Sequence, residues 1–261
     1  MANLFGANWR DGLRAAIEII EKDHKVEWFL DEKVPDPNEK WDAVLFWSDS
    51  TCPFFSQIDN YNAKKGIFLT TDPMNIYNLK KLDAVFCEST PVFDDAKKYG
   101  LTNAIKAFGT DTEFYKPDLN IKKDIMFFYP ATFSPWKRQD VIASLGGRLL
   151  CVGTVQPDGM NEYGLCKKMG VRIEEGYFPA QKIKDYFDRS HMVVIPAIHG
   201  SERTVLESMS MGIPPIVYPY NKRAHSYIIE YINSGTQNPR EFVVQNYSAQ
   251  KYADIIMDGI S

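Results

Sequence analysis

The sequence lacks most of the short motifs by which common enzyme classes are recognised. No Gly-x-Gly-x-x-Gly, Walker A or Gly-x-Ser-x-Gly pattern occurs in its 261 residues. Dehydrogenases with a dinucleotide cofactor, P-loop NTPases and α/β-hydrolases rely on those patterns to bind phosphates or to expose a nucleophilic serine. The sequence therefore does not support assignment to any of these three enzyme classes.

Patterns that predict a metal site or disulfides are also missing. The histidines are scattered, no Asp-x-Asp occurs, and the cysteines show no Cys-x-x-Cys spacing. We therefore expect no bound metal and reduced thiols, which are typical of a cytoplasmic protein. The cysteines are Cys52, Cys87, Cys151 and Cys166.

Long apolar runs and an excess of positive charge are absent as well. No segment approaches the roughly 18 uninterrupted apolar residues of a membrane span, so we expect no transmembrane helix. The first residues lack the basic start and apolar core of a signal peptide. A net charge of −4 gives no general attraction to nucleic acid or anionic lipid.

What is present is an alternation of apolar strand-like runs and helical stretches, which predicts parallel sheets covered by helices. The polar stretch 116–123 separates two halves, so we expect domains at 1–117 and 118–261. In the first half, strands are expected at 4–7, 26–30, 43–47, 67–70, 84–87 and 104–107, and helices at 10–22, 77–82 and 92–98. In the second half, strands are expected at 125–129, 149–152, 171–173, 192–195, 215–218 and 242–244, and helices at 139–145, 161–169, 180–189, 202–211 and 249–257.

The most informative segment is 195–217, which reads as a strand, a polar loop, a short helix and another strand. Gly212 and the prolines after it end the helix. Its N-terminus offers free N–H groups that favour a phosphate. Arg203 and Glu207 lie four residues apart on one face, and a carboxylate there can accept hydrogen bonds from sugar hydroxyls. This combination suits a sugar nucleotide. The alternative is an ordinary α/β unit with a surface Arg–Glu pair.

The same segment resembles the signature of group 1 (family-4-like) glycosyltransferases, which have the GT-B fold. Two positions depart from that signature: His199 replaces the first glutamate and Glu202 replaces the second glycine. The spacing of Arg203 and Glu207 is closer to the divergent spore-maturation-type branch. The positions that match are Gly200, Leu206, Glu207, Met209, Gly212, Pro214 and Val217.

Two further segments resemble the same family, in the family's order. Residues 108–117 are similar to the Gly-Val-Asp-Thr stretch that closes its first domain, and 124–142 to the strand and loop that open its second. Lys137 matches the lysine that contacts the donor diphosphate. The family arginine has no clear equivalent, and Arg138 is the candidate substitute. Alternatively, both are solvated charges, although cations at a helix start oppose the helix dipole.

The resemblance implies an α/β GT-B protein, with two Rossmann-like doubly wound domains facing a central cleft. It implies a retaining, metal-independent hexosyltransferase-like enzyme that uses a nucleotide-sugar donor, such as a UDP- or GDP-sugar, and no cofactor. Catalytic roles would fall to Lys137, Arg138, His199 and Glu207. Donor-binding roles would fall to Gly6, Asn8, Gly176, Tyr177, Gly200, Ser201, Glu202, Arg203, Thr204 and Glu207.

Several alternatives stay open at the level of sequence. Tyr177 and its neighbour Phe178 can stack against a nucleobase or can be plain core. A chain that lost the first glutamate can be a non-catalytic nucleotide- or sugar-phosphate-binding module, or a GT-B sugar-nucleotide epimerase. The acceptor can be a glycan, a protein or another hydroxyl-bearing molecule. A nucleic-acid acceptor is disfavoured by the acidic balance.

Overall fold

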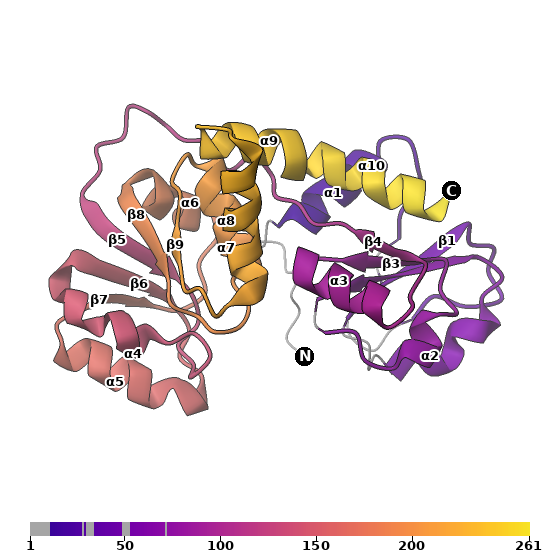
Figure 1. The fold of residues 1–261 in the computed structure, drawn as a ribbon, viewed down its shortest axis with the longest axis horizontal. Helices are drawn as coiled ribbons and strands as arrows, with labels where there is room; N and C mark the ends of the chain where they lie inside the picture. Colours follow the sequence, from indigo (N-terminus) through magenta and orange to yellow (C-terminus); the bar gives the residue numbers. More distant parts are fainter. Residues whose placement is uncertain (1–10, 28, 30–33, 49–52, 71) are drawn as a thin grey trace. The chain divides into compact units, whose positions relative to one another are not determined.

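A computed structural model describes residues 11–27, 29, 34–48, 53–70 and 72–261. The chain divides into two compact units (Figure 1). Over the described residues, unit 1 comprises 12–109 and Ala249–Ser261, and unit 2 comprises Asp11 and Thr110–Ser248. Each unit is built around its own parallel sheet.

Unit 1 contains a sheet of four described strands in the order β1-β2-β3-β4, all parallel. The strands are β1 (Ala43–Ser48), β2 (Lys64–Leu69), β3 (Ala84–Cys87) and β4 (Ala104–Lys106). The helices are α1 (Gly12–Ile20), the 3₁₀ helix η1 (Pro53–Asn60), α2 (Ile76–Leu79), α3 (Thr90–Lys98) and α10 (Ala249–Ile260).

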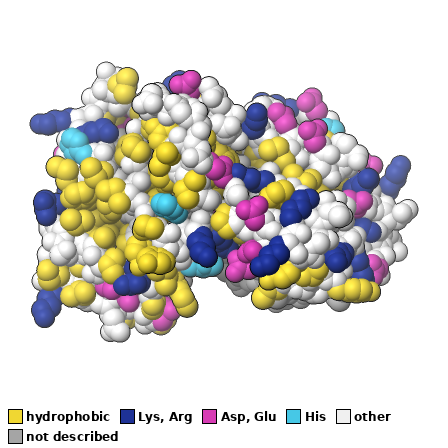
Figure 2. Space-filling view, in the orientation of Figure 1, with side chains coloured by type: hydrophobic (Ala, Val, Ile, Leu, Met, Phe, Trp, Pro, Cys, Tyr) yellow, Lys and Arg dark blue, Asp and Glu magenta, His cyan; other side chains and the backbone are white. Residues whose placement is uncertain are grey.

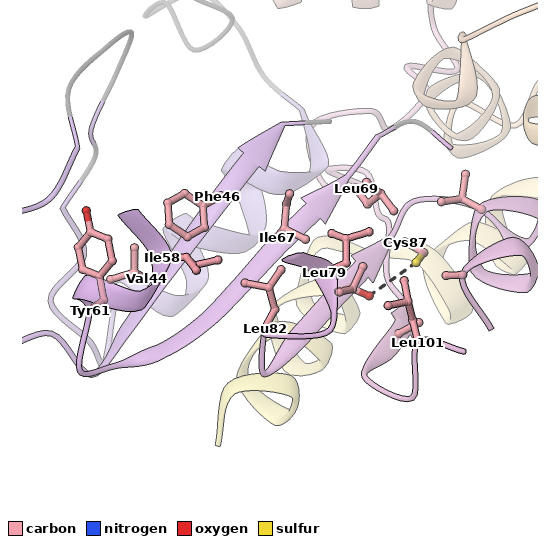
Figure 3. Packing of buried hydrophobic residues seen from close by; sticks show 14 residues of the cluster. Val44, Phe46, Ile58, Tyr61, Ile67, Leu69, Leu79, Leu82, Cys87 and Leu101 are labelled. Carbon is pink, nitrogen blue, oxygen red and sulfur yellow. Dashed lines mark hydrogen bonds between the residues drawn. The ribbon is translucent and has the colours of Figure 1, made fainter. Parts of the chain in front are cut away.

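The core of unit 1 lies on both faces of this sheet because its central strands are apolar on both sides. Every residue of β3 is buried. On one face Ile67 and Leu69 pack with Leu79 of α2 and Leu101 (Figure 3). On the other face Phe86 packs with residues of α1 and α10, which lie side by side (Figure 1).

Unit 2 contains a parallel sheet in the order β7-β6-β5-β8-β9, a doubly wound arrangement. The strands are β5 (Ile125–Pro130), β6 (Leu149–Gly153), β7 (Arg172–Glu175), β8 (Ser190–Ile195) and β9 (Ile216–Val217). The α-helices are α4 (Gln139–Ile142), α5 (Met160–Lys168), α6 (Ala180–Asp188), α7 (Glu202–Ser210), α8 (Lys222–Ser234) and α9 (Pro239–Tyr247). The 3₁₀ helices are η2 (Ala143–Arg148) and η3 (Pro157–Gly159).

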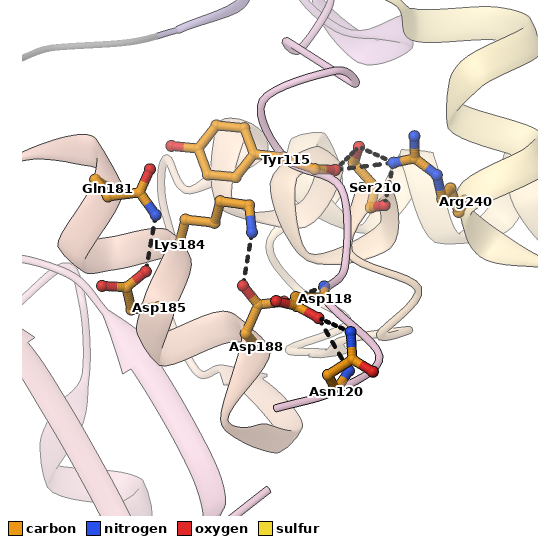
Figure 4. A network of polar contacts seen from close by, with 9 residues as sticks. All are labelled: Tyr115, Asp118, Asn120, Gln181, Lys184, Asp185, Asp188, Ser210 and Arg240. Atoms are coloured by element: carbon orange, nitrogen blue, oxygen red, sulfur yellow. Dashed lines mark hydrogen bonds and ion pairs between the residues drawn. The ribbon is translucent and has the colours of Figure 1, made fainter. Parts of the chain in front are cut away.

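The division between the units differs from the predicted boundary at 117/118 because hydrogen bonds hold segment 110–118 onto unit 2. Arg240 Nη1 donates to Tyr115 O (2.9 Å), and Ser210 Oγ donates to the same oxygen (2.6 Å) (Figure 4). Further along, Asp118 N donates to Asp188 Oδ1 (2.8 Å). The predicted assignment of 249–261 to the second domain is also corrected, since α10 packs in the core of unit 1.

Two other predictions about elements are corrected by the structure. The expected strand 242–244 lies inside α9, where Phe242 and Val243 are buried and Val244 is exposed. Asn238 caps this helix, because its Oδ1 accepts from Arg240 N (2.9 Å). The described residues of 26–30 form no strand. Helix α8 was not expected at all.

The surface of unit 2 exposes large apolar side chains near its edge strand. Met192 of β8, Ile216 of β9 and the following Tyr218 and Tyr220 are all exposed. In the face drawn in Figure 2, hydrophobic side chains gather over unit 2 more than over unit 1. No helix in the described part of the chain has the length and apolar character needed to cross a membrane.

Candidate functional site

The candidate site lies at the carboxyl ends of β5 and β8, the central neighbours in the sheet of unit 2. From β5 the chain continues to β6 on one side, and from β8 it continues to β9 on the other. The loops that leave such a pair diverge, and the crevice between them is where doubly wound sheets bind ligands. The two loops are residues 131–138 and 196–201.

Lys137 joins these two loops. Its Nζ donates to Ser201 Oγ (3.1 Å) and to His199 O (3.2 Å), more than sixty residues away in the chain. The structure therefore brings together Lys137, His199 and Ser201, which the sequence analysis had predicted as site residues from separate motifs. An ammonium beside a helix N-terminus is suited to bind an anion.

The loop that carries Lys137 is held in place by its own hydrogen bonds. Tyr129 OH donates to Lys137 O (3.0 Å), and Gln139 Nε2 donates to Thr132 O (3.0 Å). Burial raises the pKa of Tyr129, so its hydroxyl stays protonated and remains a donor. Ile198 N also donates to Trp136 O (3.0 Å), which ties the backbones of the two loops together.

The turn at 199–201, which we call the Gly200 turn, has an unusual backbone. Gly200 and Ser201 both lie in the left-handed region, with φ of 73° and 77°. Glycine adopts this conformation without strain, whereas serine pays for it. Asn221 holds the turn, since its Nδ2 donates to Gly200 O (2.8 Å) while its Oδ1 accepts from Ala224 N (3.2 Å) at the start of α8.

Glu202, the first residue of α7, forms a buried ion pair with Arg223 of α8. The distance from Arg223 Nε to Glu202 Oε1 is 3.1 Å, and the two residues are 7% and 5% exposed. Glu202 Oε1 has no hydrogen bond of good geometry among the described residues, so the pair is held by charge. Glu202 had been predicted to contact the donor; the structure gives it a partner that was not predicted.

Glu207, one turn further along α7, has its carboxyl inside unit 2. Arg203 Nε lies 3.4 Å from Glu207 Oε1. Burial raises the pKa of Glu207 to about 7, against the attraction of Arg203. Burial likewise raises the pKa of Tyr115. The predicted contact of Glu207 with donor ribose stays a prediction, as does the donor contact of the buried Thr204.

Arg138, the predicted substitute for the family arginine, pairs with a different group. It lies in the left-handed region (φ 54°) just before α4, and its Nε is 3.2 Å from Asp140 Oδ1. No hydrogen bond or ion pair found in the described residues joins it to the Gly200 turn. The structure thus brings Lys137, but not Arg138, to that turn.

Gly176 and Tyr177 follow β7, which lies three strands from β8 in the sheet. Gly176 N donates to Gly153 O (3.1 Å), and its φ of 137° requires glycine. Tyr177 is 81% exposed, so it is not core. Adjacent strands are about 4.8 Å apart, so β7 and β8 are separated by roughly 14 Å in the sheet. Gly6 and Asn8 lie outside the described residues.

Sequence reasoning missed three residues of this site: Tyr129, Asn221 and Arg223. Tyr129 lies in a strand and reads as core. Asn221 and Arg223 open helix α8, which was not predicted. The signal that could have found them is an asparagine N-cap after β9, followed by Arg223, Tyr227 and Glu230 at helical spacing.

Comparisons with known proteins identify the fold. No protein-family model and no curated protein matches the sequence. Among solved structures, sucrose-phosphate synthase from Thermosynechococcus elongatus is similar with a TM-score of 0.62 and 15% identity, covering 84% of this chain and 72% of that one. Anabaena Alr3699/HepE, solved with UDP and glucose, is similar with a TM-score of 0.55 and 14% identity, covering 75% of this chain and 71% of that one.

A third similar structure is AviGT4, a glycosyltransferase involved in avilamycin A biosynthesis, with a TM-score of 0.57 and 14% identity over 86% of this chain and 74% of that one. Identities this low show a shared fold and nothing finer. The chain therefore has the α/β fold of GT-B glycosyltransferases, with two Rossmann-like units.

Proposed function

We propose that this protein is a glycosyltransferase that moves a sugar from a nucleotide-sugar donor to a hydroxyl-bearing acceptor. The observation that carries the proposal is the convergence of Lys137 Nζ with the Gly200 turn at the N-terminus of α7. This arrangement, on the GT-B fold, is suited to a diphosphate. Alr3699/HepE, which shares the fold, was solved in complex with UDP-glucose.

The chemistry asks mainly for stabilisation of negative charge. When the bond from the sugar to the diphosphate breaks, charge builds on the leaving phosphate. The Lys137 ammonium and the N–H groups at the start of α7 are preorganised to stabilise it, as donors in an oxyanion hole do. Glu207 would hold the donor ribose, and His199 would face the sugar or phosphate.

The finer parts of the proposal rest on the family resemblance. They are assignment to the group 1 family with features of the spore-maturation-type branch, retention of anomeric configuration, and transfer without metal or cofactor. The ion pair between Arg203 and Glu207 supports the branch assignment, since that branch has the same spacing. A cytoplasmic location is part of the same proposal and rests on the cysteine pattern of the sequence.

The same proposal assigns a binding role to each unit. Unit 2 would bind the nucleotide sugar, because it carries Lys137 and the Gly200 turn. Unit 1 would bind the acceptor, which we propose is a glycan, a protein or another hydroxyl-bearing molecule. A nucleic-acid acceptor is disfavoured by the net charge of −4.

Nucleotide release from a panel of UDP- and GDP-sugars, followed by chromatography with and without candidate acceptors, tests the proposal. Release that depends on an acceptor is the expected result. Binding without release would instead indicate a nucleotide- or sugar-phosphate-binding module. Conversion of one nucleotide sugar to its isomer would indicate a GT-B epimerase. No binding and no turnover with any member of the panel would overturn the proposal.

A further inference from the structure

The negative charge of Glu202 lies where the negatively charged diphosphate of the proposed donor would bind. The carboxylate stands at the first position of α7, beside the Gly200 turn. A Cβ atom on Gly200 would lie 2.7 Å from Lys137 Nζ and 4.0 Å from Glu202 Oε2. The ammonium and the carboxylate thus flank the same small space. A diphosphate entering it would be repelled by Glu202, since like charges repel strongly in a poorly solvated site.

Arg223 is placed to cancel that charge. It is buried beside Glu202, with Nε 3.1 Å from Oε1, and it comes from α8, whose capping residue Asn221 also holds Gly200 O. The start of α8 therefore contacts this site at two points. Arg138, the other candidate cation, is engaged with Asp140.

We propose that Arg223 is a positioning residue of the donor site, which neutralises Glu202 and holds its carboxylate away from the diphosphate. The inference rests on the proposed function, because it assumes that a nucleoside diphosphate binds at the Gly200 turn. With Lys137 and Arg223 both present, the three charged groups carry one net positive charge, and without Arg223 they carry none.

The test is a titration of the protein with UDP, and with GDP in parallel, for wild type, Arg223→Gln, Glu202→Gln and the double variant Glu202→Gln/Arg223→Gln. Arg223→Gln leaves a buried carboxylate unpaired, so we expect UDP or GDP to bind about 30-fold more weakly or worse. Glu202→Gln removes the negative charge that would repel the phosphates and is expected to bind at least as tightly as wild type. The double variant should return to within about 3-fold of wild type, because a neutral pair replaces an ion pair without an unpaired charge.

Arg189→Gln is the matched control. Arg189 also forms an ion pair, with Asp124 at 2.7 Å, but directly before the first residue of β8, at the opposite end of that strand from the Gly200 turn. Its loss is expected to change UDP affinity by less than about 2-fold, as for other exposed ion pairs. In turnover assays Arg223→Gln should raise the KM for the donor more than it lowers kcat.

The outcomes separate this inference from the proposed function. Wild type that binds neither nucleotide overturns the proposed function and this role with it. Wild type that binds, with Arg223→Gln binding equally well, overturns the role of Arg223 alone. A double variant as weak as Arg223→Gln shows that the unpaired charge of Glu202 does not cause the weaker binding, and it also overturns the role. If Arg223→Gln does not fold, the other two variants decide. Weaker nucleotide binding by Glu202→Gln than by wild type overturns the role of Arg223. Equal or tighter binding by Glu202→Gln, together with a double variant that binds as wild type does, supports that role.

Discussion

The two units share parallel sheets and crossing helices, but their interiors differ in polarity. Among the described residues of unit 1, no charged side chain is buried, and apart from tyrosines the one buried polar side chain is Ser89. Unit 2 buries charged side chains, including Asp188, Glu202, Glu207 and Arg223. Burying a charge costs free energy even when it is paired. Stability alone therefore accounts for the interior of unit 1 but not for that of unit 2.

The positions of the buried charges indicate what they serve. Asp188 holds segment 110–118, where the chain enters unit 2. Glu202, Glu207 and Arg223 belong to the elements that follow β8 and β9, at the proposed donor site. The comparison suggests that substitutions in unit 1 act mainly on stability, whereas those in unit 2 act on pH dependence and rate.

The largest expected effect is on the apolar core of unit 1. Phe86 is buried and stacks on Phe68, with ring centroids 5.1 Å apart. Phe86→Ala should lower the free energy of unfolding in urea by about 3–5 kcal/mol, because it leaves a cavity. Leu119→Ala is the control, since Leu119 is 91% exposed and its loss should cost under about 0.5 kcal/mol. A similar small loss for Phe86→Ala would contradict the packing described.

A second expected effect concerns the buried carboxyl of unit 2. The folded-state pKa of Glu207 is about 7, above the reference value of 4.5. The folded state therefore holds this proton more tightly than the unfolded state, and stability falls as pH rises between these values. Glu207→Gln escapes that loss. Its free energy of unfolding relative to wild type should rise by up to about 3 kcal/mol between pH 4.5 and 8.

Chemical denaturation of the two proteins across this pH range measures the effect. Groups other than Glu207 contribute equally to both proteins, so the difference isolates this carboxyl. A difference between variant and wild type that stays constant with pH would show that folding does not raise the pKa of Glu207. The burial described for this carboxyl would then be wrong.

A third effect is on rate. Charge on the diphosphate grows towards the transition state, so a lysine that faces it matters more for turnover than for affinity. Lys137→Ala should lower turnover by about 100-fold, comparable to the loss of one oxyanion donor. Arg138→Ala should do less, because Arg138 pairs with Asp140. Wild-type turnover in Lys137→Ala would show that loop 131–138 is not the phosphate loop.

The smallest expected effect is that of a chelator. If Lys137 and the N-terminus of α7 carry the phosphate charge, transfer does not need a divalent ion. Turnover after treatment with EDTA should equal that of the untreated protein. Loss of turnover that manganese or magnesium restores would contradict the metal-independent mechanism. It would indicate that a divalent ion assists transfer at the donor site of unit 2.

Strands that are continuously apolar were predictable from the sequence. The expected strand 84–87 coincides with β3, and 125–129 lies within β5. The same reasoning failed at 242–244, where Phe-Val-Val reads as a strand. There Asn238 and Pro239 begin a helix, and two of the three apolar residues face its buried side. A three-residue run is too short for its period to separate helix from strand.

Part of the candidate site was also predictable. The motifs identified Lys137, His199 and Ser201 separately, and the fold joins them because β5 and β8 are neighbours. Arg223 was not predictable, since nothing in the sequence shows that α8 starts beside α7. The predicted place of Arg138 in the phosphate site is not supported by any contact found in the described residues.

By itself, the sequence determined the α/β class, most strands of both units, and the lysine and helix N-terminus suited to a phosphate. These depend on local pattern, namely apolar runs, caps and spacing within one segment. Tertiary structure decided that segment 110–118 belongs to unit 2 and that α10 returns to unit 1. It also decided that Glu202 is neutralised by Arg223. Such pairings join residues far apart in the chain, and their free energy comes from burial, which exists only once the chain has folded.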